Sequence, residues 1–233
     1  MASLTPDEWS AIGLSLRVGV VATIVAIPFA LVIALRLARG RFPGRLVLDA
    51  IVHLPLVAPP VVTGYLLLLA FGRNGPVGRF LEETFGIVLA FRWTGAVLAA
   101  AVMGLPLMVR SMRLSVEAID RKLEDAARTL GAGRVRVFLR ITLPLMMPGI
   151  LAGAVLCFAR ALGEFGATIT FVGNIPGETR TIPTAIYTEL QVPGGDPAAL
   201  RLTVISLAIA LGALLVAEIL ARKARGKRRR VIE

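Results

Sequence analysis

Two charged side chains, Arg160 and Glu164, stand inside a long apolar stretch of this sequence, residues 145–172. They are four positions apart, so on a helix they would share one face and form an ion pair. A charged side chain at the centre of a membrane helix costs at least about 2.5 kcal/mol and normally faces a bundle interior or a watery cavity. The pair is a candidate gate for an anion, because Glu164 would weaken the hold of Arg160 enough for the anion to leave. The alternative is a fixed structural brace at a bend near Gly163 and Gly166.

Prolines and hydroxyl groups supply a second set of candidates for a polar path through a membrane. Pro59 and Pro60, followed by Thr63, interrupt another apolar run, and Thr168 follows the charged pair. A proline removes a backbone donor and clashes with the preceding turn, so it leaves carbonyl oxygens without their helical partners. These four residues are predicted to line the pathway, with a purely structural kink as the alternative.

The sequence contains no constellation of residues typical of catalysis. Its three lysines, Lys122, Lys223 and Lys227, all lie outside a G-x-x-x-x-G-K-[ST] phosphate-binding context. His53 is the only histidine and Cys157 the only cysteine, so neither a metal site nor an intrachain disulfide is predicted. We therefore predict no catalytic residue, no metal site and no cofactor bound by this chain.

The elements that must position these residues are membrane-spanning helices. Apolar residues make up 56% of the 233 residues and charged residues 18%, against about 45–50% and about 25% in soluble domains. Runs long enough for spans of about 20 residues cover 11–37, 46–72, 95–113, 145–172 and 199–221. This composition excludes a secreted domain, a disordered chain and an outer-membrane barrel. We predict an all-α membrane protein with five transmembrane helices, the second kinked or broken near residues 58–60.

The distribution of positive charge predicts the orientation of these spans. Nineteen of the 26 Lys and Arg side chains lie in residues 36–45, in the loop 110–140 and in the basic tail 222–233. Lys and Arg accumulate on the cytoplasmic side of a membrane, so these segments and the C-terminus are predicted to be cytoplasmic and the N-terminus external. The net charge of +11 is then a topology signal. We expect contact with membrane lipid and no nucleic-acid partner.

The cytoplasmic loop 114–144 is too long and too regularly patterned to be a simple connector. Its apolar residues recur every three or four positions, which predicts an amphipathic helix over 116–130; they are Val116, Ile119, Leu123, Ala126, Ala127 and Leu130. Gly131 follows as a helix stop, and Pro144 suits the first turn of the next span. Such a helix either lies on the bilayer surface or docks into a groove of a cytoplasmic partner.

The residue types and spacing in this loop resemble the EAA signature of ABC importer permeases. That signature runs Glu-Ala-Ala, three residues, Gly, nine residues, Ile, one residue, Leu-Pro. The spacing is matched in full by Asp125, Ala126, Ala127, Gly131, Ile141, Leu143 and Pro144. Asp125 replaces the glutamate of the signature, and Glu124 stands one position earlier, so a carboxylate remains available nearby.

The resemblance extends over nearly the whole chain. Residues 53–64, 159–170 and 174–183 are similar to the permease subunits of molybdate ABC transporters. Permeases for sulfate and tungstate share parts of these motifs, but they commonly carry an extra N-terminal span. The resemblance implies a type I ABC importer permease fold, with a transmembrane domain over residues 11–221, in the cell inner membrane.

Further implications of the resemblance concern partners and mechanism. It implies a homodimer of permeases with two ATP-binding subunits, which would bind ATP and Mg²⁺, and an external, periplasmic molybdate-binding protein. The segment 125–131 would be the coupling helix seated in the ATPase, and molybdate would cross the membrane by alternating access. Tungstate or sulfate is the alternative cargo. A stand-alone secondary transporter with Glu164 as its proton carrier is a second class, but such proteins usually show internal repeats, which this sequence lacks.

Overall fold

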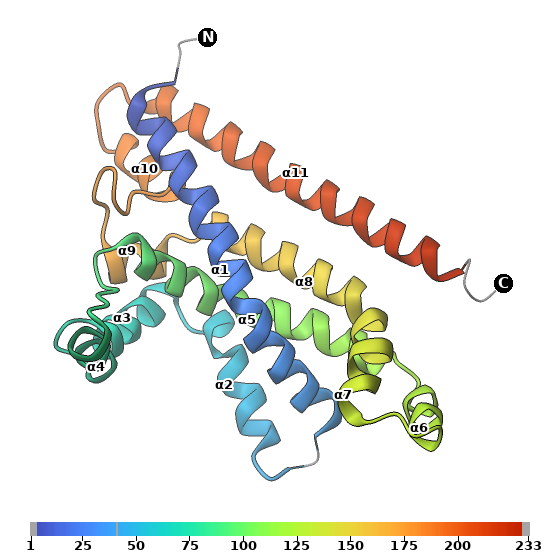
Figure 1. Ribbon diagram of the computed structural model, residues 1–233. Helices are drawn as coiled ribbons and strands as arrows, with labels where there is room; N and C mark the ends of the chain where they lie inside the picture. Colours follow the sequence, from blue (N-terminus) through green and yellow to red (C-terminus); the bar gives the residue numbers. More distant parts are fainter. Residues whose placement is uncertain (1–3, 41, 230–233) are drawn as a thin grey trace.

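A computed structural model describes residues 4–40 and 42–229, with side chains through residue 216 and at residue 219. Within these ranges every regular element is helical (Figure 1). The helices are α1 (Pro6–Arg39), α2 (Arg45–Val57), α3 (Pro60–Phe71), α4 (Pro76–Phe85), α5 (Trp93–Glu117), α6 (Arg121–Thr129), α7 (Arg134–Val137), the π-helix η1 (Phe138–Thr142), α8 (Leu143–Leu162), α9 (Gly166–Val172), α10 (Ile182–Glu189) and α11 (Asp196–Arg229).

Four helical segments of the described chain are long and apolar enough to cross a membrane: α1, α5, the continuous run from Arg134 to Leu162, and α11 as far as Val216. The pair α2 and α3 is a fifth candidate, so the predicted five spans are matched when this pair counts as one. The pair is bent by 116°. The predicted break is confirmed, and it lies where Pro59 precedes the first helical residue of α3, Pro60. A proline fits that first position, since the N–H it lacks would have no helical partner there.

Three elements differ from the sequence-based prediction. The predicted fourth span, 145–172, is broken: α8 ends at Leu162, and α9 begins at Gly166. The predicted helix over 116–130 is interrupted: α5 continues to Glu117, and α6 begins only at Arg121. The cause is Asp120, whose carboxylate accepts a hydrogen bond from the backbone N–H of Lys122 at 2.9 Å and so caps a new helix. The predicted basic tail continues α11 as far as Arg229; its side chains and residues 230–233 lie outside the described part.

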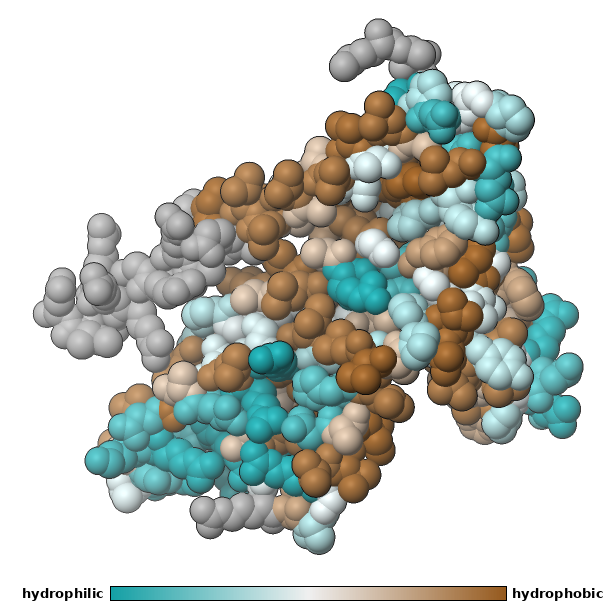
Figure 2. Space-filling model, turned by 180° about the vertical axis from the view of Figure 1, so that it is seen from behind, coloured by the Kyte–Doolittle hydropathy of each residue, from teal (hydrophilic) through white to brown (hydrophobic). Residues whose placement is uncertain are grey.

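Contacts at the two ends of α1 agree with the predicted topology. Near its first turn, Glu8 accepts a hydrogen bond from Arg201 of α11 at 2.8 Å. At its last residue, Arg39 is paired with Glu124 of α6. The first turns of α1 and α11 therefore lie at one end of the molecule and α6 at the other. Figure 2 shows hydrophilic residues gathered at the end that holds α6 and α7, next to large apolar surfaces.

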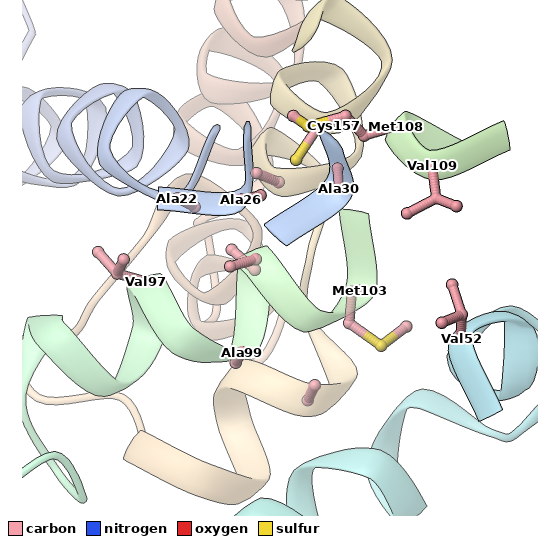
Figure 3. Close-up of a cluster of buried hydrophobic side chains, with 14 of the residues drawn as sticks. Ala22, Ala26, Ala30, Val52, Val97, Ala99, Met103, Met108, Val109 and Cys157 are labelled. Atoms are coloured by element: carbon pink, nitrogen blue, oxygen red, sulfur yellow. The ribbon is translucent and has the colours of Figure 1, made fainter. Parts of the chain in front are cut away.

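The core is built where α1, α5 and α8 pack on one another. Ala22, Ala26 and Ala30 of α1 and Ala99 of α5 are at most 2% exposed and belong to the same buried cluster (Figure 3). Small side chains let helix backbones approach closely, which is the main source of packing energy between helices in lipid. By contrast, α11 packs mainly on α8 and α10, and most of those of its apolar side chains that the structure describes are exposed.

We expect replacement of Gly104 by valine to disrupt a close approach of α5 to α8. A Cβ at Gly104 would lie 2.5 Å from Sγ of Cys157, which is buried. Overpacking a core typically costs about 1–3 kcal/mol, so G104V should reduce the amount of folded protein, measured by gel filtration after detergent extraction. Gly13→Val is the matched control, because nothing lies within 4 Å of its Cβ position. Equal losses of folded protein in G104V and G13V would show that the contact with Cys157 is not the cause.

Candidate functional site

Arg160 and Glu164 form an ion pair at the break between α8 and α9. Nη1 of Arg160 lies 2.7 Å from Oε2 of Glu164, whose side chain is 1% exposed. Because α8 ends at Leu162, the two residues do not share a continuous helix face, as their spacing had suggested. The other carboxylate oxygen accepts a hydrogen bond from the backbone N–H of Ala167 at 2.9 Å, in the first turn of α9. Glu164 therefore joins the end of one helix to the beginning of the next, which is the arrangement expected of a brace.

The other candidate pathway residues come together where α3 packs on α9. A Cβ on Gly166 would lie 2.7 Å from Cβ of Pro60, so the break between α2 and α3 lies against the break between α8 and α9. Thr63 and Thr168 are both buried, whereas Pro59 and Pro60 are exposed. Irregular backbone at membrane depth is tolerated only where it is buried in protein or lines a watery cavity. Two interrupted helices thus meet at one place in the fold.

His53 and the described acidic side chains give no sign of a metal centre. Nδ1 of His53 lies 2.9 Å from the backbone carbonyl oxygen of Asp49, one turn earlier in α2. Among the residues that the structure describes, no group of three His, Cys, Asp or Glu side chains is placed to hold a metal ion. The single histidine is therefore a local hydrogen-bond partner.

The apolar stripe predicted for the cytoplasmic loop divides into a buried part and an exposed part. Val116 and Ile119 belong to the core, whereas Leu123 is 50% exposed and Leu130 is 88% exposed. Ala126 is also exposed on α6. An apolar face that is left open on a short polar helix is typical of a surface that docks into a partner.

The end of α6 is fixed by the glycine of the EAA signature. Gly131 has a φ of +82°, and its N–H donates to the carbonyl of Arg128 at 2.9 Å. The next N–H, of Ala132, reaches back to the carbonyl of Ala127 at 3.0 Å. These two bonds are those of a Schellman motif, which requires a left-handed backbone conformation at the residue that follows the helix end, here Gly131. Glycine adopts that conformation without the cost a side chain would add.

Glu124, and not Asp125, is the carboxylate that the fold buries. Its side chain is 4% exposed and accepts hydrogen bonds from the guanidinium of Arg39 and the hydroxyl of Thr142. Burial raises the pKa of Glu124, but the hydrogen bonds from Arg39 and Thr142 outweigh burial, and the pKa lies below its ordinary value. The pairing therefore stabilises the fold at neutral pH and is lost as the pH falls through this lowered pKa. Asp125 is exposed and contacts Arg128 at 3.4 Å.

The Leu-Pro of the signature explains how Thr142 reaches Glu124. Pro144 has no N–H to donate to the carbonyl of Arg140, and its ring would clash with that carbonyl in a regular α-helix. The chain widens instead into the π-helix η1, in which the N–H of Leu143 donates to the carbonyl of Phe138, five residues earlier. Such wide turns often occur at functional sites. Here the wide turn ends at Thr142, which holds Glu124.

The fold and these sites agree with what comparison shows. Residues 26–226 match the family described as binding-protein-dependent transport system inner membrane component, and the chain belongs to that family. It is 60% identical over 222 residues to the molybdenum transport system permease protein ModB of Escherichia coli (strain K12), covering 95% of this chain and 97% of that protein. It is 53% identical over 220 residues to the protein of the same name from Haemophilus influenzae, covering 94% and 96%.

A less similar relative and two solved structures extend the comparison. Sulfate permease 2, chloroplastic, of Chlamydomonas reinhardtii is 40% identical over 212 residues, which are 90% of this chain and 56% of that protein. Among solved structures, a bacterial ABC transporter that imports alginate superposes with a TM-score of 0.74 at 20% identity, over 94% of this chain and 80% of that chain. An amino acid ABC transporter gives 0.65 at 19% identity, over 94% of each chain. The predicted ABC importer permease fold is confirmed, and the family makes this chain a multi-pass inner-membrane transport component and not an ATPase.

Proposed function

We propose that this chain is the permease subunit of an ATP-driven importer and forms the path by which molybdate crosses the cell membrane. The observation that supports this most strongly is the 60% identity to the Escherichia coli molybdenum permease over nearly the full length of both chains. The sulfate permease is less similar, and the match covers only 56% of it. Sulfate and tungstate remain the alternative cargoes that the experiment below compares with molybdate.

The subunits proposed to complete the transporter are a second copy of this chain, two ATP-binding subunits and an external molybdate-binding protein. The exposed apolar face of α6 supports the ATPase contact, because Leu123 and Leu130 would otherwise remain in water. ATP and Mg²⁺ would be bound by the ATP-binding subunits. In this arrangement, closure of the ATPase pair pulls α6, and the two permeases alternate between outward-open and inward-open states.

The proposed pathway passes the place where the two interrupted helix pairs meet. Thr63 and Thr168 supply hydroxyl groups there, and the breaks at Pro59 and at Glu164 allow α3 and α9 to change their angles. Within this region the ion pair of Arg160 and Glu164 acts mainly as a brace between α8 and α9. Both carboxylate oxygens of Glu164 are engaged, one by the guanidinium of Arg160 and the other by the backbone N–H of Ala167, which supports the brace over a role in secondary transport.

Uptake by the purified complex in liposomes tests the proposal. The permease, the ATP-binding subunit and the substrate-loaded binding protein are combined, and labelled molybdate, tungstate and sulfate are offered separately with ATP inside. We expect ATP-dependent uptake of molybdate that exceeds uptake of sulfate. Preference for sulfate would overturn the cargo, and uptake by the permease without ATPase or ATP would overturn the ATP-driven mechanism.

A further inference from the structure

The coupling segment α6 is attached to the rest of the permease by a single buried side chain. Of its nine residues, only Glu124 is buried. The others face outward or are partly exposed, and short connections at 118–120 and 130–133 join α6 to its neighbours. Apart from these connections, a force applied to α6 by a partner reaches the body of the protein chiefly through the Glu124 carboxylate.

That carboxylate joins two elements that are distant in sequence. One oxygen accepts from Arg39, the last residue of α1, and the other accepts from Thr142, immediately before α8. Both helices are part of the core, where α1 and α8 pack on each other and on α5. A displacement of Glu124 therefore acts on α1 and α8 together, although 85 residues separate Arg39 from Glu124.

We propose that Arg39, Glu124 and Thr142 form a latch that transmits the movement of α6 to α1 and α8; this inference rests on the proposed ATP-driven function. The three are positioning residues, since none of them needs to touch the transported anion. The Arg39 side chain is 24% exposed, but its Nη2 is buried and has no hydrogen-bond partner among the described residues, so the Glu124 carboxylate is the main compensation for its charge. Removing the charge of Glu124 would leave this partly buried guanidinium without its counter-charge, which is unfavourable.

The latch differs from the exposed contacts of the same helix. Asp125 and Arg128 form an ion pair at 3.4 Å with side chains that are 67% and 52% exposed, and exposed pairs contribute little. A matched control lies outside α6: Glu82 of α4 pairs with Arg73 at 3.9 Å, and both side chains are accessible to solvent. Glu124→Gln removes the charge but preserves the shape of the side chain, and Glu82→Gln makes the same change in this accessible pair.

The test measures ATP hydrolysed per molybdate imported, in liposomes that contain equal amounts of assembled complex. Coupling between two sites typically changes an affinity about fivefold or more. On this scale, we expect E124Q to raise the number of ATP molecules hydrolysed per imported molybdate at least fivefold while the ATP-binding subunit remains bound. E82Q should leave the ratio unchanged. Thr142→Val should raise the ratio less than E124Q does, and Thr142→Ser, which keeps the hydroxyl, should restore it.

Two results would overturn the latch. One is an unchanged ratio in both E124Q and T142V. The other is parallel loss of the ATP-binding subunit, uptake and hydrolysis in both variants, which would make the three residues a structural contact only. Absence of uptake by the wild-type complex is a different result, because it would contradict the proposed function and not the latch alone.

Discussion

Replacing Arg160 by glutamine is expected to lower both the membrane abundance of the permease and its uptake of molybdate. The reason is the burial of Glu164, whose side chain is 1% exposed and whose charge Arg160 compensates at 2.7 Å. Removing one member of a buried ion pair typically costs about 3–5 kcal/mol, a large part of the stability of most proteins. Quantitative immunoblots of purified membranes, alongside uptake assays, measure the two effects.

Two further variants separate a brace from a direct gate. Arg79→Gln, which alters an exposed arginine of α4, should change neither abundance nor uptake. The double variant R160Q/E164Q removes both charges, so its abundance should recover substantially. If R160Q kept normal abundance but lost uptake, the brace would be contradicted and a gating role for Arg160 supported.

Replacing Gly131 by valine is expected to remove most of the ATP-binding subunit from the purified permease. A side chain in the left-handed conformation costs roughly 1–2 kcal/mol, and a cost of about 1.4 kcal/mol weakens an affinity tenfold. The strain would open the Schellman turn at the end of α6 and displace the neighbouring Leu130, which is 88% exposed. Co-purification of the ATP-binding subunit with tagged permease, at fixed salt concentration, measures the loss.

Gly133 provides the matched control for this substitution. Its φ is −65°, which a valine adopts without strain, and nothing lies within 4 Å of its Cβ position. Gly133→Val should therefore keep the ATP-binding subunit. Equal retention by G131V and G133V would show that the conformation of Gly131 does not matter for assembly.

Local patterns explain why much of this fold could be predicted from sequence. Span positions follow from the length of apolar runs, and the break before Pro60 follows from two adjacent prolines. The stop at Gly131 follows from a glycine placed after an amphipathic segment. Asp120 also indicates an interruption, since aspartate is a preferred helix cap. The apolar spacing continues past it, however, and so favours one unbroken helix.

Features that depend on distant partners could not be predicted. Arg39 is one of several arginines that mark the cytoplasmic side, and nothing in its local sequence indicates that it meets Glu124. The EAA signature points to Asp125, whereas the carboxylate that the fold buries is that of Glu124. The bend of 116° between α2 and α3 likewise depends on how α3 packs against α9, which no local pattern contains.

The proposed role of α6 is tested most directly by a cysteine in place of Leu130. Cys157, the single native cysteine, is buried, so a bifunctional thiol reagent would react with the introduced residue and with a cysteine placed in the groove of the ATP-binding subunit. Val192→Cys, at an exposed residue between α10 and α11, is the control for the opposite end of the molecule. The expected result is a cross-link from position 130 whose yield changes with ATP, and none from position 192. An importing complex in which position 130 never cross-links, or reacts with impermeant reagent from the periplasm, would contradict the role of α6 as the contact with the ATPase.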